Sequence, residues 1–332
     1  MILRVISLAM IGLLPGGCGP LILAIGTVPG GQQLRATVVD SEGGWHAGRI
    51  AIIDVSGLIV NAPRHGLLRD GDNPVSLLDE ELKMARMDSR IRAVILRLNT
   101  PGGTVTASDA MYRQVQRFKR QTGKPVVALI MDVGASGGYY LACAADRIIA
   151  YPTSVVGSIG VIMQTISVKT ALGRIGVETK ALTTGPNKAA GSPFNTLTDE
   201  QQVVLQRLVD DFYRRFRAVV RDARPKIPAD RFDTLTDGRV LSGDQAVKAG
   251  LIDQVGDLYD AREIAKQLAH IRRADLIRYH RPIQYVGSPY AAAPGHESHA
   301  GQTQINIAQF NLGRPFGDAF TGFWYLWRPG MP

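Results

Sequence analysis

The sequence predicts an α/β fold built on a parallel sheet, and three observations lead to this prediction. Strand-like and helix-like patterns alternate over residues 49–280, which is typical of parallel sheets with right-handed crossovers. Apolar residues make up 45% of the 332 residues and charged residues 20%, so the chain can bury a core and does not belong to the disordered class. Its 36 glycines and 18 prolines favour a loop-rich enzyme over a helical bundle.

In the first part of the catalytic domain, strand-like and helix-like patterns of apolar residues alternate. A strand is predicted over 50–60, followed by a helix near 74–88 whose apolar residues recur on one face. A β-branched strand at 91–98 comes next, and then a second amphipathic helix over 108–121. Residues 125–131 are nearly all apolar, the pattern of a strand buried on both faces.

Later elements are shorter, apart from one long helix. Short strands are expected over 147–151, 154–163 and 251–255. The long amphipathic helix over 198–224 begins with a capping box formed by Thr198 and Gln201. A short helix over 242–249 ends at Gly250, a residue typical of helix C-termini.

The two ends of the chain differ from this middle region. We divide the sequence into an N-terminal membrane or signal segment (1–34), a linker (35–48), a catalytic domain (49–280) and a tail (281–332). The tail is expected to be poorly ordered, because no helix-like or strand-like pattern of apolar residues continues beyond about residue 285. Its aromatic side chains would give it affinity for a partner or a membrane surface: Phe323, Trp324, Tyr325 and Trp327.

Residues 5–34 carry no charge, and Arg4 stands just before them. Twenty-four helical residues would span roughly 36 Å, enough for a bilayer core, although the prolines and glycines of 15–20 break such a helix. Three interpretations stay open: a retained anchor, a signal peptide cut after Gly26, or lipid attachment at Cys18. Each places the catalytic domain outside the cytoplasm.

Charge and cysteine content exclude other classes. The net charge of +9 is scattered along the chain, and neither zinc-ligand spacing nor an aromatic-basic motif is present, so we expect no nucleic acid partner. Two cysteines, Cys18 and Cys143, cannot build a disulfide framework. We also expect no metal and no organic cofactor.

The strongest chemical signal is a serine between glycines, Gly134-Ala135-Ser136-Gly137-Gly138. It follows the buried strand and precedes a helix, whose free N–H groups, that of Gly137 among them, can hold an oxyanion. The same pattern fits an ordinary turn or the nucleophile elbow of a Ser-His-Asp hydrolase. The elbow would need a histidine, and of the six present we weigh only His270 as a candidate.

A lysine can replace the histidine if burial keeps its amine neutral. Lys188 lies among small and apolar residues in the loop 185–194 and is the candidate. Most lysines in loops are simply solvated, so spacing alone does not decide between these interpretations.

Five blocks in order resemble the bacterial signal peptide peptidase A family of membrane-bound Ser–Lys peptidases, over roughly residues 49–260. These blocks are 99–103, 134–145, 157–162, 185–194 and 238–253. The resemblance implies a crotonase-like α/β spiral shared with Clp protease. It also implies that Ser136 is the nucleophile, Lys188 the general base, Ser158 the hydroxyl that orients the lysine, and the Gly103 N–H an oxyanion donor.

The resemblance further implies substrates, assembly and location. Family members cleave hydrophobic peptides such as signal peptide remnants. The short members form homo-oligomeric rings, here expected to be octameric, in which serine and lysine come from neighbouring protomers. The implied location is the bacterial cell membrane, with one N-terminal anchor and an extracytoplasmic catalytic domain. A crotonase-like acyl-CoA enzyme and a non-enzymatic scaffold for membrane proteins remain as alternatives.

Overall fold

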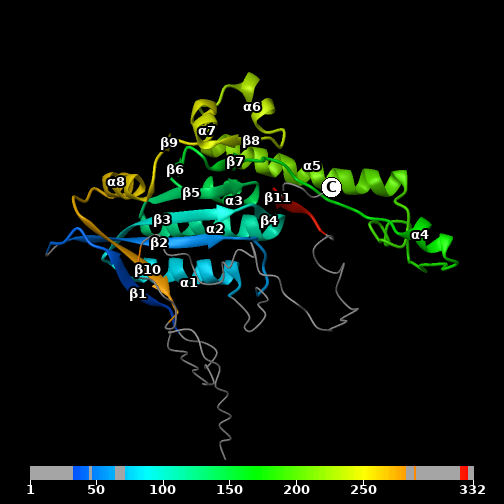
Figure 1. Ribbon diagram of the computed structural model, residues 1–332, viewed down its shortest axis with the longest axis horizontal. Coiled ribbons are helices and arrows are strands. Elements are labelled where there is room, and N and C mark those ends of the chain that lie inside the picture. Colours follow the sequence, from blue (N-terminus) through cyan, green and yellow to red (C-terminus); the bar gives the residue numbers. More distant parts are fainter. Residues whose placement is uncertain (1–32, 45–46, 64–71, 282–287, 289–321, 328–332) are drawn as a thin grey trace, which may run out of the picture. The chain divides into compact units, whose positions relative to one another are not determined.

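The computed structural model describes residues 33–44, 47–63, 72–281, 288 and 322–327. One sheet has the order β1-β10-β2-β3-β5-β6-β9, with β7 beside β5 and β8 beside β7 (Figure 1). A second, small sheet pairs β4 with β11. The strands are β1 (Arg35–Asp40), β2 (Gly48–Ser56), β3 (Ile91–Thr100), β4 (Gly102–Thr104), β5 (Val126–Ala135), β6 (Arg147–Ala150), β7 (Val155–Gly157), β8 (Val240–Ser242), β9 (Gln254–Val255), β10 (Ala274–His280) and β11 (Trp324–Leu326). Only the β1–β10, β7–β8 and β4–β11 pairs are antiparallel, so the prediction of a mostly parallel sheet is confirmed.

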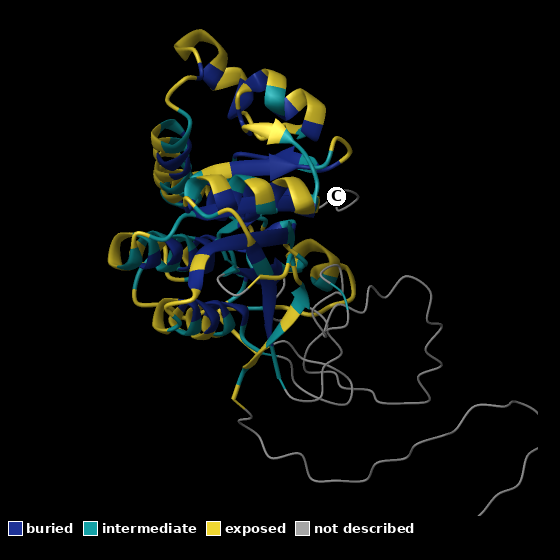
Figure 2. Cartoon of the chain, turned by 90° about the vertical axis from the view of Figure 1, so that its left-hand side faces the viewer, coloured by how far each residue is buried: buried dark blue, intermediate teal, exposed yellow. Residues whose placement is uncertain are grey.

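Helices cover both faces of this sheet. The helices are α1 (Pro74–Met87), α2 (Val105–Thr122), α3 (Gly137–Ala142), α4 (Lys169–Arg174), α5 (Asp199–Ala223), α6 (Ala229–Leu235), α7 (Gly243–Ala249) and α8 (Leu258–Leu268). The larger core lies between the sheet and α1, α2, α3 and the second half of α5. The smaller core lies under α8, on the opposite face. Because both faces are covered, the central strands are buried along most of their length (Figure 2), which explains their continuous apolar runs.

Strand β5 changes its neighbour along its length. Its first half pairs with β6 through Val127 to Ile130, and its last residues pair with β7 through Val133 to Ala135. The sheet therefore divides at the carboxyl end of β5. Ser136, the residue that follows β5, stands just beyond the β7 side of this division.

The helix ends agree with their sequence signals. Thr198 and Gln201 form a capping box at the start of α5, and Gly123 and Gly250 end α2 and α7 in the left-handed region, at φ 65° and 78°. The strand predicted over 154–163 is shorter: β7 ends at Gly157, because the next residue takes a φ of 51° and bonds its N–H to β8's neighbour Arg239.

The strand predicted over 251–255 is likewise shorter, since β9 holds only Gln254 and Val255. The N–H groups of Leu251 and Ile252 bond instead to the carbonyl of Ala246, at 2.9 and 3.4 Å. These two residues complete the end of α7 before the chain can enter the sheet.

A buried charged cluster joins three strands of the sheet. The Asp54 carboxylate accepts hydrogen bonds from Arg97 Nε at 2.5 Å and Nη2 at 2.9 Å, and from Arg278. Both arginines are buried. Glu81 of α1 is buried as well, and its Oε2 has no hydrogen-bond partner among the described residues. Burial, and secondarily the charge on Asp54, raises the pKa of Glu81 well above its usual range.

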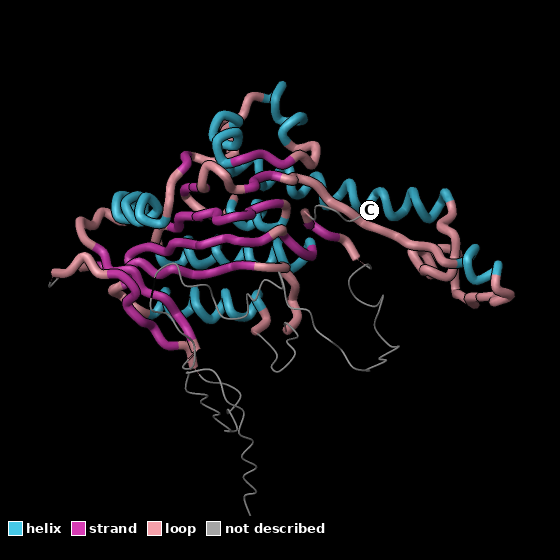
Figure 3. The backbone as a smooth tube through the Cα atoms, viewed as in Figure 1, coloured by secondary structure: helices cyan, strands magenta, loops and turns pink. Residues whose placement is uncertain are grey.

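Residues 161–200, here called the arm, run out from β7 through α4 and lead into α5 (Figures 1 and 3). No residue of the arm is buried. Several of its large apolar side chains are exposed, among them Ile175, Leu182 and Phe194, at 73%, 88% and 50%. Among the described residues, the arm therefore lacks the apolar covering that the rest of the fold has.

The tail differs from its prediction. Residues 322–327 were expected within a poorly ordered tail, yet β11 pairs with β4, and Tyr325 is fully buried. The reason is its aromatic content: Tyr325 packs against Tyr140 and Phe216, with ring centroids 5.2 and 4.7 Å away.

The predicted anchor lies almost wholly outside the described residues, as does Cys18. Among the helices that the structure describes, none combines the length and apolarity needed to cross a bilayer.

Candidate active site

Ser136 stands at the point where β5 ends and α3 begins. Its φ of 51° and ψ of −117° are unusual for a residue with a side chain, and backbone strain of this kind concentrates at functional sites. Two backbone hydrogen bonds hold it there: its N–H donates to Gly157 at 2.7 Å, and its carbonyl accepts from Tyr140 at 2.9 Å. The residue is 1% exposed. Its hydroxyl makes no hydrogen bond within the described chain.

Ser158 follows β7, the strand that pairs with the end of β5. The pair Ala135 and Gly157 is the last matched pair of β5 and β7, and the N–H of Ser136 donates to the carbonyl of Gly157, the residue before Ser158. Ser158 also has a φ of 51°, is buried, and donates its N–H to Arg239 at 2.7 Å. The structure thus brings together two of the predicted site residues.

The strand that carries the predicted oxyanion donor Gly103 passes close to the other predicted donor, Gly137. A Cβ on Gly102, whose φ is 100°, would lie 2.6 Å from the nitrogen of Gly137. A Cβ on Gly103 would lie 1.8 Å from the carbonyl oxygen of Ile59. Only glycine lets β4 pass this close to the first amide of α3, so the Pro-Gly-Gly turn places Gly102, the residue before Gly103, against the amide of Gly137.

A polar network that sequence reasoning missed holds α3 in place. Tyr140 donates its hydroxyl proton to Asp109 of α2 at 2.6 Å, and Arg215 of α5 contacts both groups, at 3.4 and 3.3 Å. Burial acts to raise the pKa of Asp109, but the hydrogen bonds from Tyr140 and Arg113, together with the Arg215 charge, lower it overall. The adjacent tyrosines after the glycine turn were the only sequence signal for this network.

Lys188 lies in the arm and is exposed. Its backbone N–H donates to Gly185 at 3.3 Å, while its side chain makes no hydrogen bond or ion pair in the part of the chain that the structure describes. The structure of one chain therefore does not join Lys188 to Ser136 or Ser158.

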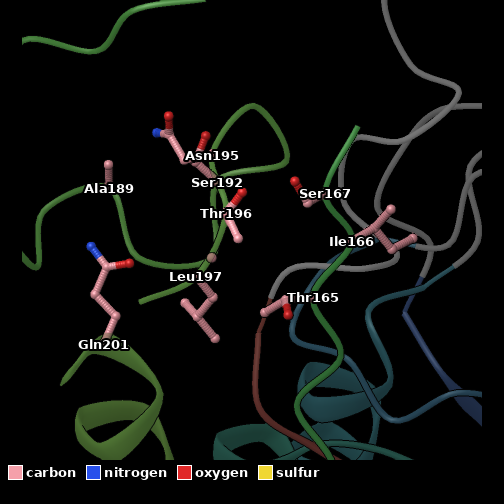
Figure 4. Close-up of a pocket in the computed structure, with 10 residues that line it drawn as sticks. Thr165, Ile166, Ser167, Ala189, Ser192, Asn195, Thr196, Leu197 and Gln201 are labelled. Atoms are coloured by element: carbon pink, nitrogen blue, oxygen red, sulfur yellow. The ribbon is translucent and has the colours of Figure 1, made fainter. Parts of the chain in front are cut away.

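A small hollow lies beside the Lys188 loop, between Ile166 and Ser167 on one side and Ser192 and Asn195 on the other (Figure 4). Apart from one residue of α5, its lining belongs to the arm, and none of the predicted site residues lines it. Gln201, at the start of α5, also lines it and donates a hydrogen bond to Pro186 at 2.5 Å.

The described histidines are not placed for a catalytic triad. His270 is exposed after the end of α8, with a φ of 53°. His280 bonds to Thr37 at 2.8 Å and to the Arg281 carbonyl. Neither makes a hydrogen bond to Ser136, and the other four histidines lie outside the described residues. No group of residues suited to hold a metal ion occurs in the described ranges.

The chain matches known peptidases. The model of peptidase family S49 matches residues 118–272, which include both serines and Lys188. The SppA protein of Enterococcus faecium is 31% identical over 232 residues, covering 70% of this chain and 67% of that protein. The chain belongs to peptidase family S49, and the resemblance read from the five sequence blocks is confirmed.

Two further relatives show the extent of the match. Protease 4 of Salmonella typhi is 34% identical over 232 residues, which are 70% of this chain. The serine protease SPPA of Arabidopsis thaliana chloroplasts is 34% identical over 209 residues, which are 62% of it. The aligned region covers only 36% and 30% of these two proteins, so the chain spans about a third of their length.

Proposed function

We propose that this protein is a serine endopeptidase that hydrolyses apolar peptides, such as cleaved signal peptides. The observation that carries the proposal is the strained, buried Ser136 at the carboxyl end of β5, with Ser158 and the amides of Gly103 and Gly137 around it. Membership of family S49 supports peptide bonds as the substrate.

In the proposed mechanism, the neutral amine of Lys188 takes the proton of the Ser136 hydroxyl as its oxygen attacks the scissile carbonyl. The amides of Gly103 and Gly137 stabilise the negative charge that develops on the carbonyl oxygen. Lys188 then gives the proton to the leaving amine, and water hydrolyses the acyl-enzyme. Ser158 orients the lysine amine through a hydrogen bond.

The exposure of Lys188 leads to the proposed assembly. An amine in water is protonated at neutral pH, so a lysine base must be desolvated. We therefore propose that a second copy of the chain covers the arm and brings Lys188 to the Ser136 of its neighbour in a ring. The absence of buried residues from the arm and its exposed apolar side chains support this assembly.

Two finer features also belong to the proposal. The mixed α/β sheet would be the crotonase and Clp protease type of spiral. The uncharged residues 5–34 would anchor the protein in a bacterial membrane, with the catalytic domain on the extracytoplasmic side.

The test is hydrolysis of a fluorogenic apolar peptide by the full chain and two lysine variants. Lys188→Ala should abolish turnover, whereas Lys180→Ala, at another exposed position of the arm, should leave it unchanged. The oligomeric state of each variant serves as the control for folding. Undiminished turnover in Lys188→Ala would overturn the dyad, and full loss in His270→Ala would replace it with a histidine triad.

A further inference from the structure

Gln201 is the one buried residue in the first half of α5. From Asp199 to Arg215 every other residue of the helix is exposed or half-buried, and the next buried residue is Phe216. The Gln201 side chain belongs to a residue that is 9% exposed. Glutamine is seldom buried unless its amide group is hydrogen-bonded, so the partners of this amide explain its position.

The two ends of the Gln201 amide bond to different segments. Its Oε1 accepts from the backbone N–H of Thr198 at 3.2 Å, which completes the capping box of α5. Its Nε2 donates to the carbonyl of Pro186 at 2.5 Å, in the loop that carries Lys188. An N–H can only donate and a carbonyl can only accept, so these partners fix which end of the amide faces which segment. A capping box needs only the first of these two bonds.

The loop is fastened to α5 through both residues that precede Lys188. Pro186 accepts the bond from Gln201, here called the clamp, and Asn187 donates its side-chain amide to Glu200 at 3.4 Å. Both bonds end in the first turn of α5. Figure 4 shows the Gln201 side chain extending from that turn toward the loop. The place of the lysine backbone is therefore set by the start of α5.

The second half of α5 packs beside the serine of the same chain. Arg215 contacts the hydroxyl of Tyr140 at 3.4 Å, and Phe216 packs against the Tyr140 ring, with centroids 5.1 Å apart. Tyr140 belongs to α3, the helix that begins after Ser136. At 1.5 Å per residue, the part of the helix between Gln201 and Arg215 spans about 21 Å. The clamp therefore keeps the lysine at the opposite end of α5 from α3 (Figure 1).

We propose that Gln201 is a positioning residue, whose amide clamps the Lys188 loop on α5 so that the lysine meets the Ser136 of a neighbouring copy in one defined place. This inference rests on the proposed function and adds a residue to the lysine half of its site. Gln201 touches neither the substrate nor the reacting atoms, because it acts through the backbone of the loop. A base that is held in place before the reaction needs less ordering in the transition state.

The substitution Gln201→Glu separates the clamp from the helix cap. Glutamate is a common partner of threonine in a capping box, and its carboxylate still accepts from Thr198. It has no N–H to give to Pro186 at neutral pH, so the clamp is lost while the cap remains. Gln202→Glu, at the exposed next position, is the matched control because it adds the same charge. Gln201→Met is a second variant, of similar length and without charge, that also lacks the donor.

Amide hydrogen exchange of the full chain tests the clamp without relying on catalysis. The readout is the exchange rate of residues 187–192. We expect Gln201→Glu and Gln201→Met to speed this exchange at least about fivefold, because the loop loses a hydrogen bond to a buried group. Gln202→Glu should leave the rate within about twofold of that of the natural chain.

Hydrolysis of the fluorogenic apolar peptide tests the positioning role. Gln201→Glu and Gln201→Met should lower kcat about tenfold and change KM by less than about twofold, because the peptide binds beside the serine and not at the arm. The acidic limb of the pH profile of kcat should also move to higher pH, since a loosely held amine is more solvated and solvated lysines stay protonated to higher pH. A residue needed only for the helix cap would leave the Gln201→Glu profile unmoved.

The outcomes separate this inference from the proposed function. Faster exchange together with a lower kcat in both Gln201 variants would support the inference. Faster exchange in these variants, with full activity in Lys188→Ala, would support the clamp and contradict the proposed function. Unchanged exchange, or an unchanged kcat where Lys188→Ala is inactive, would overturn the inference. Failure of both Gln201 variants to fold would also overturn it, since the side chain would then serve the helix and not the loop.

Discussion

Removing the hydroxyl of Tyr140 should destabilise the protein by about 1.5 kcal/mol. Tyr140→Phe loses the 2.6 Å hydrogen bond to Asp109, and bonds to charged groups contribute about 1.5–3 kcal/mol. The lower end applies because Asp109 is 25% exposed and keeps its ion pairs with Arg113 and Arg215. At about 2–4 °C per kcal/mol for a domain of this size, Tm should fall by about 3–6 °C.

Tyr112→Phe is the matched control for this variant. The Tyr112 ring packs edge-on against Tyr140, with centroids 5.2 Å apart, but its hydroxyl has no hydrogen-bond partner in the described part of the chain. Its loss should change the free energy of unfolding by less than about 0.5 kcal/mol. Urea titrations of the natural chain and both variants measure the free energy of unfolding. An equal decrease of this free energy in the two variants would refute the role given to the Asp109 network.

Three other substitutions test the fold and the site. Asp54→Ala should cost about 3–5 kcal/mol in urea unfolding, because two buried arginines lose their shared carboxylate; the exposed Asp132→Ala should cost less than about 1 kcal/mol. The pKa of Glu81 is raised above its usual 4.5 in the folded protein. Above that pH the unfolded chain loses this proton before the folded chain does, so the free energy of unfolding decreases as the pH rises. The difference in Tm between Glu81→Gln and the natural chain should therefore grow in favour of the variant from pH 5 to pH 8, and a constant difference would contradict the raised pKa. Gly103→Ala should lower kcat by on the order of 100-fold, because its Cβ displaces β4, whereas Gly173→Ala, with open space around it, should not; equal rates would remove Gly103 from the site.

Local signals predicted the sheet and its helices well. The apolar runs of β3 and β5 follow from burial on both faces, and the capping residue Thr198 and the glycine at 123 mark helix ends by their own side-chain and backbone chemistry. The same holds for Ser136: the glycines around it permit a sharp turn between β5 and α3.

The features that could not be predicted from the sequence depend on contacts between residues that are far apart along the chain. Tyr325 is buried only because β11 pairs with β4, more than 200 positions earlier, and no periodicity in the tail indicates this. Asp109 and Arg215 look like ordinary exposed charges on their helices until Tyr140 joins them. The environment of Lys188 likewise depends on what covers the arm, which lies beyond the reach of local patterns.

The most direct test of the central claim mixes two inactive variants. If the serine of one copy works with the lysine of another, Ser136→Ala and Lys188→Ala should each be inactive alone. A mixture of the two, dissociated and reassembled together, should regain hydrolysis of the apolar peptide, because some neighbouring pairs then hold an intact serine and an intact lysine. Absence of activity from a mixture shown to contain mixed assemblies would contradict the dyad between neighbouring copies.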